Sequence, residues 1–104
     1  RENYHVAYQE RAWLLATCAD ASVRDGLQAV AQAEKACELT AHRHRRSVET
    51  LAAAWAETGD FQQAVQWQTK VVQLVNDQAA ARLAKKRLEL YQQGRPFRQA
   101  VRKP

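Results

Sequence analysis

Apolar residues recur every three to four positions through most of this chain, a spacing that places them along one face of an α-helix. Five stretches carry this pattern, and none alternates apolar and polar residues as a half-buried strand would. Leu39 and Leu83 belong to these apolar faces, so we expect both side chains to face the core. The sequence therefore predicts an all-α fold without strands. The expected helices span about residues 4–18, 25–40, 46–58, 61–75 and 78–93.

The clearest local signal is the Gly59-Asp60 pair between the third and fourth expected helices. Glycine adopts the left-handed conformation that ends many helices. Asp60 is a good first cap for the next helix, and Gln63 three residues later completes the pattern of a capping box. Residues 50–75 are therefore expected to form a tight helical hairpin.

Part of the chain repeats at an offset of 35 residues. The sequence AVAQAEKACEL at 29–39 aligns with AVQWQTKVVQL at 64–74. Self-similarity at this period indicates stacked helical hairpins. Much of the 46% apolar content is alanine, so a single hairpin has few large side chains to bury. Stacking would cover the exposed faces, and a terminal helix would cap the last one.

The sequence LAAAWAETGDFQQAVQWQTKVVQL at 51–74 resembles the tetratricopeptide repeat (TPR) family. The first hairpin matches more weakly through AWLLA at 12–16, because Arg11 stands where the family usually has an apolar residue. The closing GRPFR at 94–98 resembles the ending after the last helix of similar bacterial TPR segments. The positions that match in the better copy are Leu51, Ala52, Trp55, Gly59, Phe61, Ala64, Val71 and Leu74.

The resemblance implies two TPR-like hairpins and a C-terminal capping helix, a fragment of a right-handed α-solenoid. The chain contains no methionine, so we expect it to be part of a larger polypeptide or a processed product. Phe97 is the expected apolar anchor near the end of the chain. The expected units are a single domain at 1–98 (hairpin one about 4–40, hairpin two about 46–75, capping helix about 78–93) and a basic tail at 99–104.

TPR arrays usually bind extended peptides on the concave face lined by the first helix of each hairpin. The resemblance thus implies a non-catalytic protein-interaction or scaffolding module. Its partner would be a protein, a peptide, a neighbouring domain or a second copy of the chain. Trp13 has two open interpretations: an aromatic anchor in the groove, or a contact with a preceding helix outside this chain. The groove candidates are Gln9, Trp13, Arg46, Glu49, Ala53 and Glu57.

The formal net charge of +5 is unevenly distributed along the chain. Residues 1–41 carry a net −2, whereas residues 78–104 carry a net +7. An alternative function is therefore a basic adaptor that binds nucleic acid or another acidic partner. No nucleic-acid recognition motif accompanies the charge. The candidate basic residues are Arg43, Arg45, Lys85, Lys86, Arg87, Arg95 and Arg98.

No group of residues in the sequence has the spacing of a catalytic or metal site. Cys18 and Cys37 lack a placed histidine, and His42 and His44 do not share a helix face. Acidic residues of the third helix, including Glu49, are expected on solvated faces. We therefore expect no enzyme, no cofactor and no metal. No run approaches the ~20 apolar residues that cross a bilayer, and a cytoplasmic location is favoured.

Overall fold

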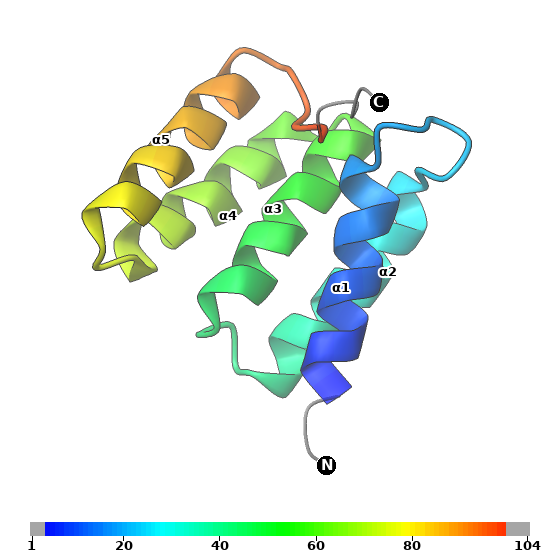
Figure 1. Ribbon diagram of the computed structural model, residues 1–104, viewed down its shortest axis with the longest axis horizontal. Helices are drawn as coiled ribbons and strands as arrows, with labels where there is room; N and C mark the ends of the chain where they lie inside the picture. Colours follow the sequence, from blue (N-terminus) through cyan, green and yellow to red (C-terminus); the bar gives the residue numbers. More distant parts are fainter. Residues whose placement is uncertain (1–3, 100–104) are drawn as a thin grey trace, which may run out of the picture.

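The computed structural model describes residues 4–99, and its regular elements in this range are all helices (Figure 1). The predicted all-α class is confirmed, and each helix end falls within one residue of its expected position. Residues 100–104 of the predicted basic tail lie outside the described residues. The helices are α1 (Tyr4–Thr17), α2 (Gly26–Leu39), α3 (Arg45–Thr58), α4 (Phe61–Leu74) and α5 (Gln78–Gln92).

The first four helices form two consecutive helical hairpins, α1–α2 and α3–α4. The hairpins stack because α3 packs against both α1 and α2. α5 packs mainly on α4. In Figure 1, α3 runs between α1 on one side and the α4–α5 pair on the other. α5 thus extends the arrangement beyond the second hairpin and does not cover α3.

The 35-residue repeat of the sequence is also a repeat of the packing. The bounds of α2 and α4 differ by this offset at both ends. Ala29 and Ala64 occupy equivalent places, and both are fully buried. The α1–α2 connection is longer than the turn between α3 and α4, as the sequence predicts. The chain therefore repeats its second helices closely and varies the loop before them.

The turn between α3 and α4 has the predicted geometry. Gly59 has a φ of 93°, and its N–H donates to the Ala56 carbonyl. The Asp60 carboxylate accepts a hydrogen bond from the Gln63 N–H at 3.2 Å. The Asp60 N–H donates to the Trp55 carbonyl at 3.1 Å, as in a Schellman ending. Only the Asp60 half of the expected capping box is therefore used.

The end of α2 has the same ending without a glycine. The His42 N–H donates to the Cys37 carbonyl at 2.8 Å, and the Ala41 N–H donates to the Glu38 carbonyl at 3.3 Å. Ala41 and His42 accordingly have φ values of 55° and 58°. Because a Cβ atom disfavours this conformation, the loop carries local strain.

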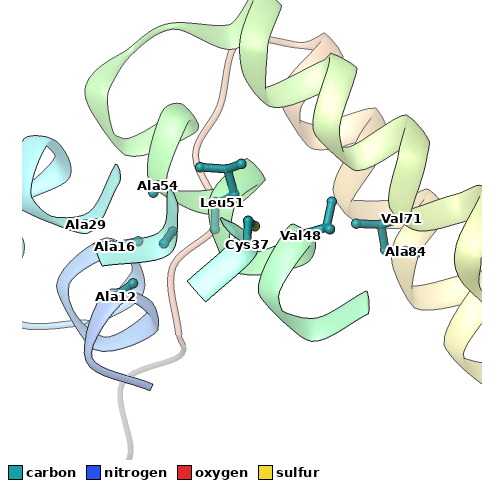
Figure 2. Close-up of a cluster of buried hydrophobic side chains, with 11 residues drawn as sticks. Ala12, Ala16, Ala29, Cys37, Val48, Leu51, Ala54, Val71 and Ala84 are labelled. Atoms are coloured by element: carbon teal, nitrogen blue, oxygen red, sulfur yellow. The ribbon is translucent and has the colours of Figure 1, made fainter. Parts of the chain in front are cut away.

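Small side chains from all five helices make the main core (Figure 2). α1 and α2 contribute mostly alanines, whereas Val48, Leu51 and Val71 supply larger groups. Two expectations about the core were wrong: Leu39 is 53% exposed and Leu83 is 49% exposed. Both lie at the borders of their apolar stripes, where neighbouring alanines take the core positions.

A long polar side chain also lies in the core. Gln68 of α4 is fully buried, and its Nε2 donates to the Ala84 carbonyl of α5 at 3.0 Å. This bond ties α5 to the second hairpin.

Cys37 is buried and Cys18 is partly buried, and both are free thiols. Burial raises the pKa of the Cys37 thiol to about 12, so it remains protonated at neutral pH.

Candidate functional site

A cleft of about 660 Å³ lies between α1, α3 and α5. It exists because α5 packs on α4 and leaves the neighbouring face of α3 uncovered. Four of the six predicted groove residues line it together, although they come from two helices. These four are Gln9, Trp13, Arg46 and Glu49.

The other two groove candidates lie elsewhere. Ala53 is 1% exposed and belongs to the main core, so the groove prediction for it was geometrically wrong. Glu57 lies two turns beyond Glu49 on α3, outside the lining of the cleft. The core-facing surface of α3 is wider than expected because α1, α2 and α4 all pack on this helix.

Glu49 sits in the wall of the cleft, where two arginines contact it. Arg87 of α5 donates from Nη1 to Glu49 Oε2, and Arg45 Nη1 lies 3.7 Å from Glu49 Oε1. The side chains of Glu49 and Arg87 are each only 13% exposed. The expectation of a solvated Glu49 was therefore wrong. A carboxylate this far buried needs the opposite charge that Arg87 brings across the cleft.

Arg87 also stacks on two aromatic rings. Its guanidinium carbon lies 5.2 Å from the ring centroid of Trp13 and 4.4 Å from that of Phe97. The two rings are 5.7 Å apart. Trp13 is thus a wall of the cleft that is covered at one side by this chain's own C-terminal segment. Neither sequence interpretation of Trp13 included this arrangement.

The C-terminal segment reaches Trp13 because the chain reverses after α5. Gly94, with a φ of 73°, donates to the Tyr91 carbonyl, and the Arg95 N–H donates to the Leu90 carbonyl at 3.1 Å. Residues 95–99 then leave α5 and run across to the C-terminal ends of α3 and α1 (Figure 1). The segment ends on α1, where the Gln99 N–H donates to the Thr17 carbonyl at 2.8 Å.

Glu57 holds this segment and the α1–α2 loop at the same time. Arg98 Nη2 lies 3.0 Å from Glu57 Oε1, and Arg24 Nε lies 3.3 Å from Glu57 Oε2. Arg24 Nη1 also donates to the Cys18 carbonyl at 2.6 Å. The Glu57 side chain is 13% exposed. It is therefore a connecting residue rather than a solvated one.

The seven predicted basic candidates do not share one environment. Arg87 and Arg98 are paired with Glu49 and Glu57, and Arg45 approaches Glu49. Within residues 4–99, the remaining four form no ion pair and are exposed. The ion pairs reduce the positive charge that is free for an acidic partner. These four residues are Arg43, Lys85, Lys86 and Arg95.

A small polar group lies near the start of α3, at the end of the cleft away from the C-terminal segment. His44 Nδ1 lies 3.1 Å from Ser47 Oγ, which donates to Gln9 Oε1 at 3.4 Å. The His5 ring contacts the His44 ring edge-on at 5.0 Å. Burial, with positive charge from His5, Arg46 and Arg45, lowers the pKa of His44. This histidine is therefore neutral in the folded protein at neutral pH.

The described part of the chain contains no group of three or more His, Cys, Asp or Glu side chains that could hold a metal ion. None of its helices is long and apolar enough to cross a membrane. Neither a family model, nor a curated protein, nor a solved structure matches this chain.

Sequence reasoning missed the residues that join distant elements. Arg24 was given no role, although it bonds Glu57 of α3. Leu83 was assigned to the core, although it lines the cleft. Phe97 was the exception, because a single large apolar group in a basic segment signals an anchor. The arginines and the helix-face acids carry no comparable signal, because a single sequence does not tell which of them will pair.

Proposed function

We propose that this chain is a non-catalytic protein-interaction module built from TPR-like hairpins, and that its cleft receives an extended segment of a protein partner. The observation that supports this most directly is the cleft itself. Its volume of about 660 Å³ lies within the range of about 300–1,000 Å³ typical of binding pockets. Its walls come from the first helix of each hairpin and from α5, the surface that the TPR resemblance implies.

The lining of the cleft indicates the chemistry of the partner. Trp13 and Leu83 face it from α1 and α5, and Leu83 remains 49% exposed. Burying that apolar surface would favour binding by about 25 cal/mol per Å². Arg46 also lines the cleft, is exposed, and has no carboxylate partner within residues 4–99. We therefore assign the cleft to a segment with an apolar side chain close to an acidic one.

The source of this segment is a second protein or a neighbouring domain of a larger polypeptide. Both would present the same chemistry to Trp13, Leu83 and Arg46. The proposal includes no reaction. Of the acidic groups that line the cleft, Glu49 pairs with arginine, Asp77 caps α5, and Glu10 is exposed on α1.

A selection from a displayed library of random twelve-residue peptides tests this function. We expect the enriched peptides to combine an apolar and an acidic residue. Synthetic versions should bind Arg46→Glu and Leu83→Ala at least about tenfold more weakly than wild type, which corresponds to 1.4 kcal/mol. Arg82→Glu is the matched control, because Arg82 is exposed on α5 and does not line the cleft.

Two outcomes would contradict the proposal. One is that no peptide is enriched over a selection on the Arg46→Glu/Leu83→Ala double variant. The other is that the selected peptides bind all three single variants as tightly as they bind wild type.

A further inference from the structure

Residues 95–99 contact the rest of the protein as a bound peptide would. The segment has no regular secondary structure, and its contacts include an aromatic pair, an ion pair and a main-chain hydrogen bond. Phe97 provides an aromatic contact with Trp13, and Arg98 provides an ion pair with Glu57. The Gln99 N–H provides a main-chain hydrogen bond to Thr17.

The receiving surface has a matching group for each contact. Trp13 and Arg87 present a ring and a guanidinium to the Phe97 ring, at 5.7 and 4.4 Å. Beyond the ring, Glu57 presents a carboxylate to the next residue of the segment. A second hollow of about 350 Å³ borders Phe97 on its α5 side. The aromatic side chain and the arginine that follows it therefore each have a partner group on the folded helices.

We propose that this surface, made by Trp13, Arg87, Glu57 and the Thr17 carbonyl, is a docking site for protein segments in which an aromatic residue directly precedes an arginine. Residues 95–99 occupy the site in cis. A segment from another protein with the same aromatic–arginine sequence competes with them for it.

The cis contacts are suited to exchange with such a competitor. The Arg98 side chain is 44% exposed, so its pair with Glu57 is screened by water and contributes little stability. The segment follows α5 directly after the Gly94 turn, and its Phe97 side chain is only partly buried against α5. A short linker of this kind gives an effective concentration on the order of millimolar, which a competing segment must overcome.

This site is distinct from the open part of the cleft assigned above. Glu57 belongs only to the docking site and Arg46 only to the open part, whereas Leu83 lines both the cleft and the hollow beside Phe97. Trp13 and Arg87 are common to both. The two proposals can therefore fail separately.

The test uses the peptide GRPFRQ, which is the sequence of residues 94–99, capped at both ends. It is titrated into the full chain and into the Phe97→Ala/Arg98→Ala variant, whose own segment lacks both anchors. The Trp13 indole N–H signal in nuclear magnetic resonance spectra is followed, after assignment with Trp13→Phe. Circular dichroism establishes that the variant is folded, and Phe97→Leu is a second, milder variant that keeps an apolar side chain.

We expect saturable binding to the double variant and, because of the cis segment, at least about tenfold weaker binding to wild type. The control peptide GRPARQ should not bind. Replacing Glu57 by Gln should weaken the binding of GRPFRQ but leave the binding of GRPFQQ unchanged. Only the first peptide carries the arginine that Glu57 contacts. Phe97→Leu should bind GRPFRQ more tightly than wild type does.

Equal affinity of the peptide for wild type and for both segment variants would overturn the proposal. So would the absence of any Trp13 shift with both folded variants at millimolar peptide. In either case residues 95–99 would be a structural clip for α5 and the surface would not be a docking site.

Discussion

Glu49 and Arg87 form an ion pair across the cleft although they lie 38 residues apart in the chain. The pair joins α3 to α5, two helices that otherwise pack little on each other. Arg87 Nε is buried without a hydrogen-bond partner, so Glu49 is the main polar contact of this guanidinium. The pair therefore bridges the cleft between α3 and α5.

Removing the charge of Glu49 should destabilise the fold. We expect Glu49→Gln to lower the free energy of unfolding by about 2 kcal/mol, because it leaves the Arg87 guanidinium buried without its counter-charge. Urea denaturation measures the change. Arg87→Met, which keeps an apolar stem against Trp13, is the partner mutation. The double variant should lose about 1 kcal/mol less unfolding free energy than the sum of the losses in the two single variants. Additive losses would contradict a coupled pair.

Gly26 should not tolerate a side chain. A Cβ atom there would lie 3.0 Å from both Cγ2 and the backbone N of Thr58, where α2 begins against the end of α3. We expect Gly26→Ala to destabilise the protein by about 1–3 kcal/mol in thermal or urea unfolding. Thr58→Ser removes only Cγ2, so it should recover a minor part of the loss. Full recovery in the double variant would show that the backbone contact does not matter.

The two helix endings with left-handed residues should respond oppositely to mutation. Ala41→Gly relieves the strain of a φ of 55° but gives the unfolded chain more conformational freedom. The net effect should be a stabilisation of about 0.5 kcal/mol. Gly59→Ala introduces the same strain at a φ of 93° and should destabilise it by about 1 kcal/mol. Both are measured by urea denaturation. A destabilising Ala41→Gly would contradict the geometry of this loop.

The stability should decrease as the pH falls below neutrality. The pKa of His44 is lowered in the folded state by burial and by the positive charge of His5, Arg46 and Arg45. The unfolded chain therefore binds a proton first, and the stabilisation that is complete above the unfolded pKa of about 6.5 is lost as the pH falls towards the folded value. Unfolding measured between pH 7 and pH 5 should show a shallower slope for His44→Asn. An unchanged slope would assign the dependence to other groups.

The nucleic-acid alternative has a direct measurement. Arg87 and Arg98 are held by carboxylates, so we expect no saturable binding of random RNA or DNA 20-mers at 150 mM salt, a condition that weakens phosphate contacts. Fluorescence anisotropy at several salt concentrations measures the binding of these 20-mers. Tight, strongly salt-dependent binding that Lys85→Glu/Lys86→Glu abolishes would favour the basic adaptor.

The helices could be predicted from the sequence because each one carries its own signals. Periodic apolar residues, aspartate caps and the glycines at 59 and 94 are local, and they give the helix bounds within one residue. The joint lining of the cleft by Gln9, Trp13, Arg46 and Glu49 was also predictable, because stacked hairpins place their first helices side by side.

The ion pairs could not be predicted in the same way. Glu49 and Glu57 look like solvated residues in the sequence, and only the tertiary arrangement brings Arg87 and Arg98 to them. The place of Gln68 in the core has a similar origin. A long polar side chain is accepted there because the Ala84 carbonyl meets its amide. The TPR family assignment stays a prediction.

The contact of Gln99 with Thr17 changes how unfolding should spread through the molecule. In a linear array of hairpins each unit interacts only with its neighbours, and the last helix can fray alone. Here the segment after the last helix is bonded to the end of the first. The array is thereby closed into a ring of interactions, and loosening α1 should also increase amide hydrogen exchange in α5.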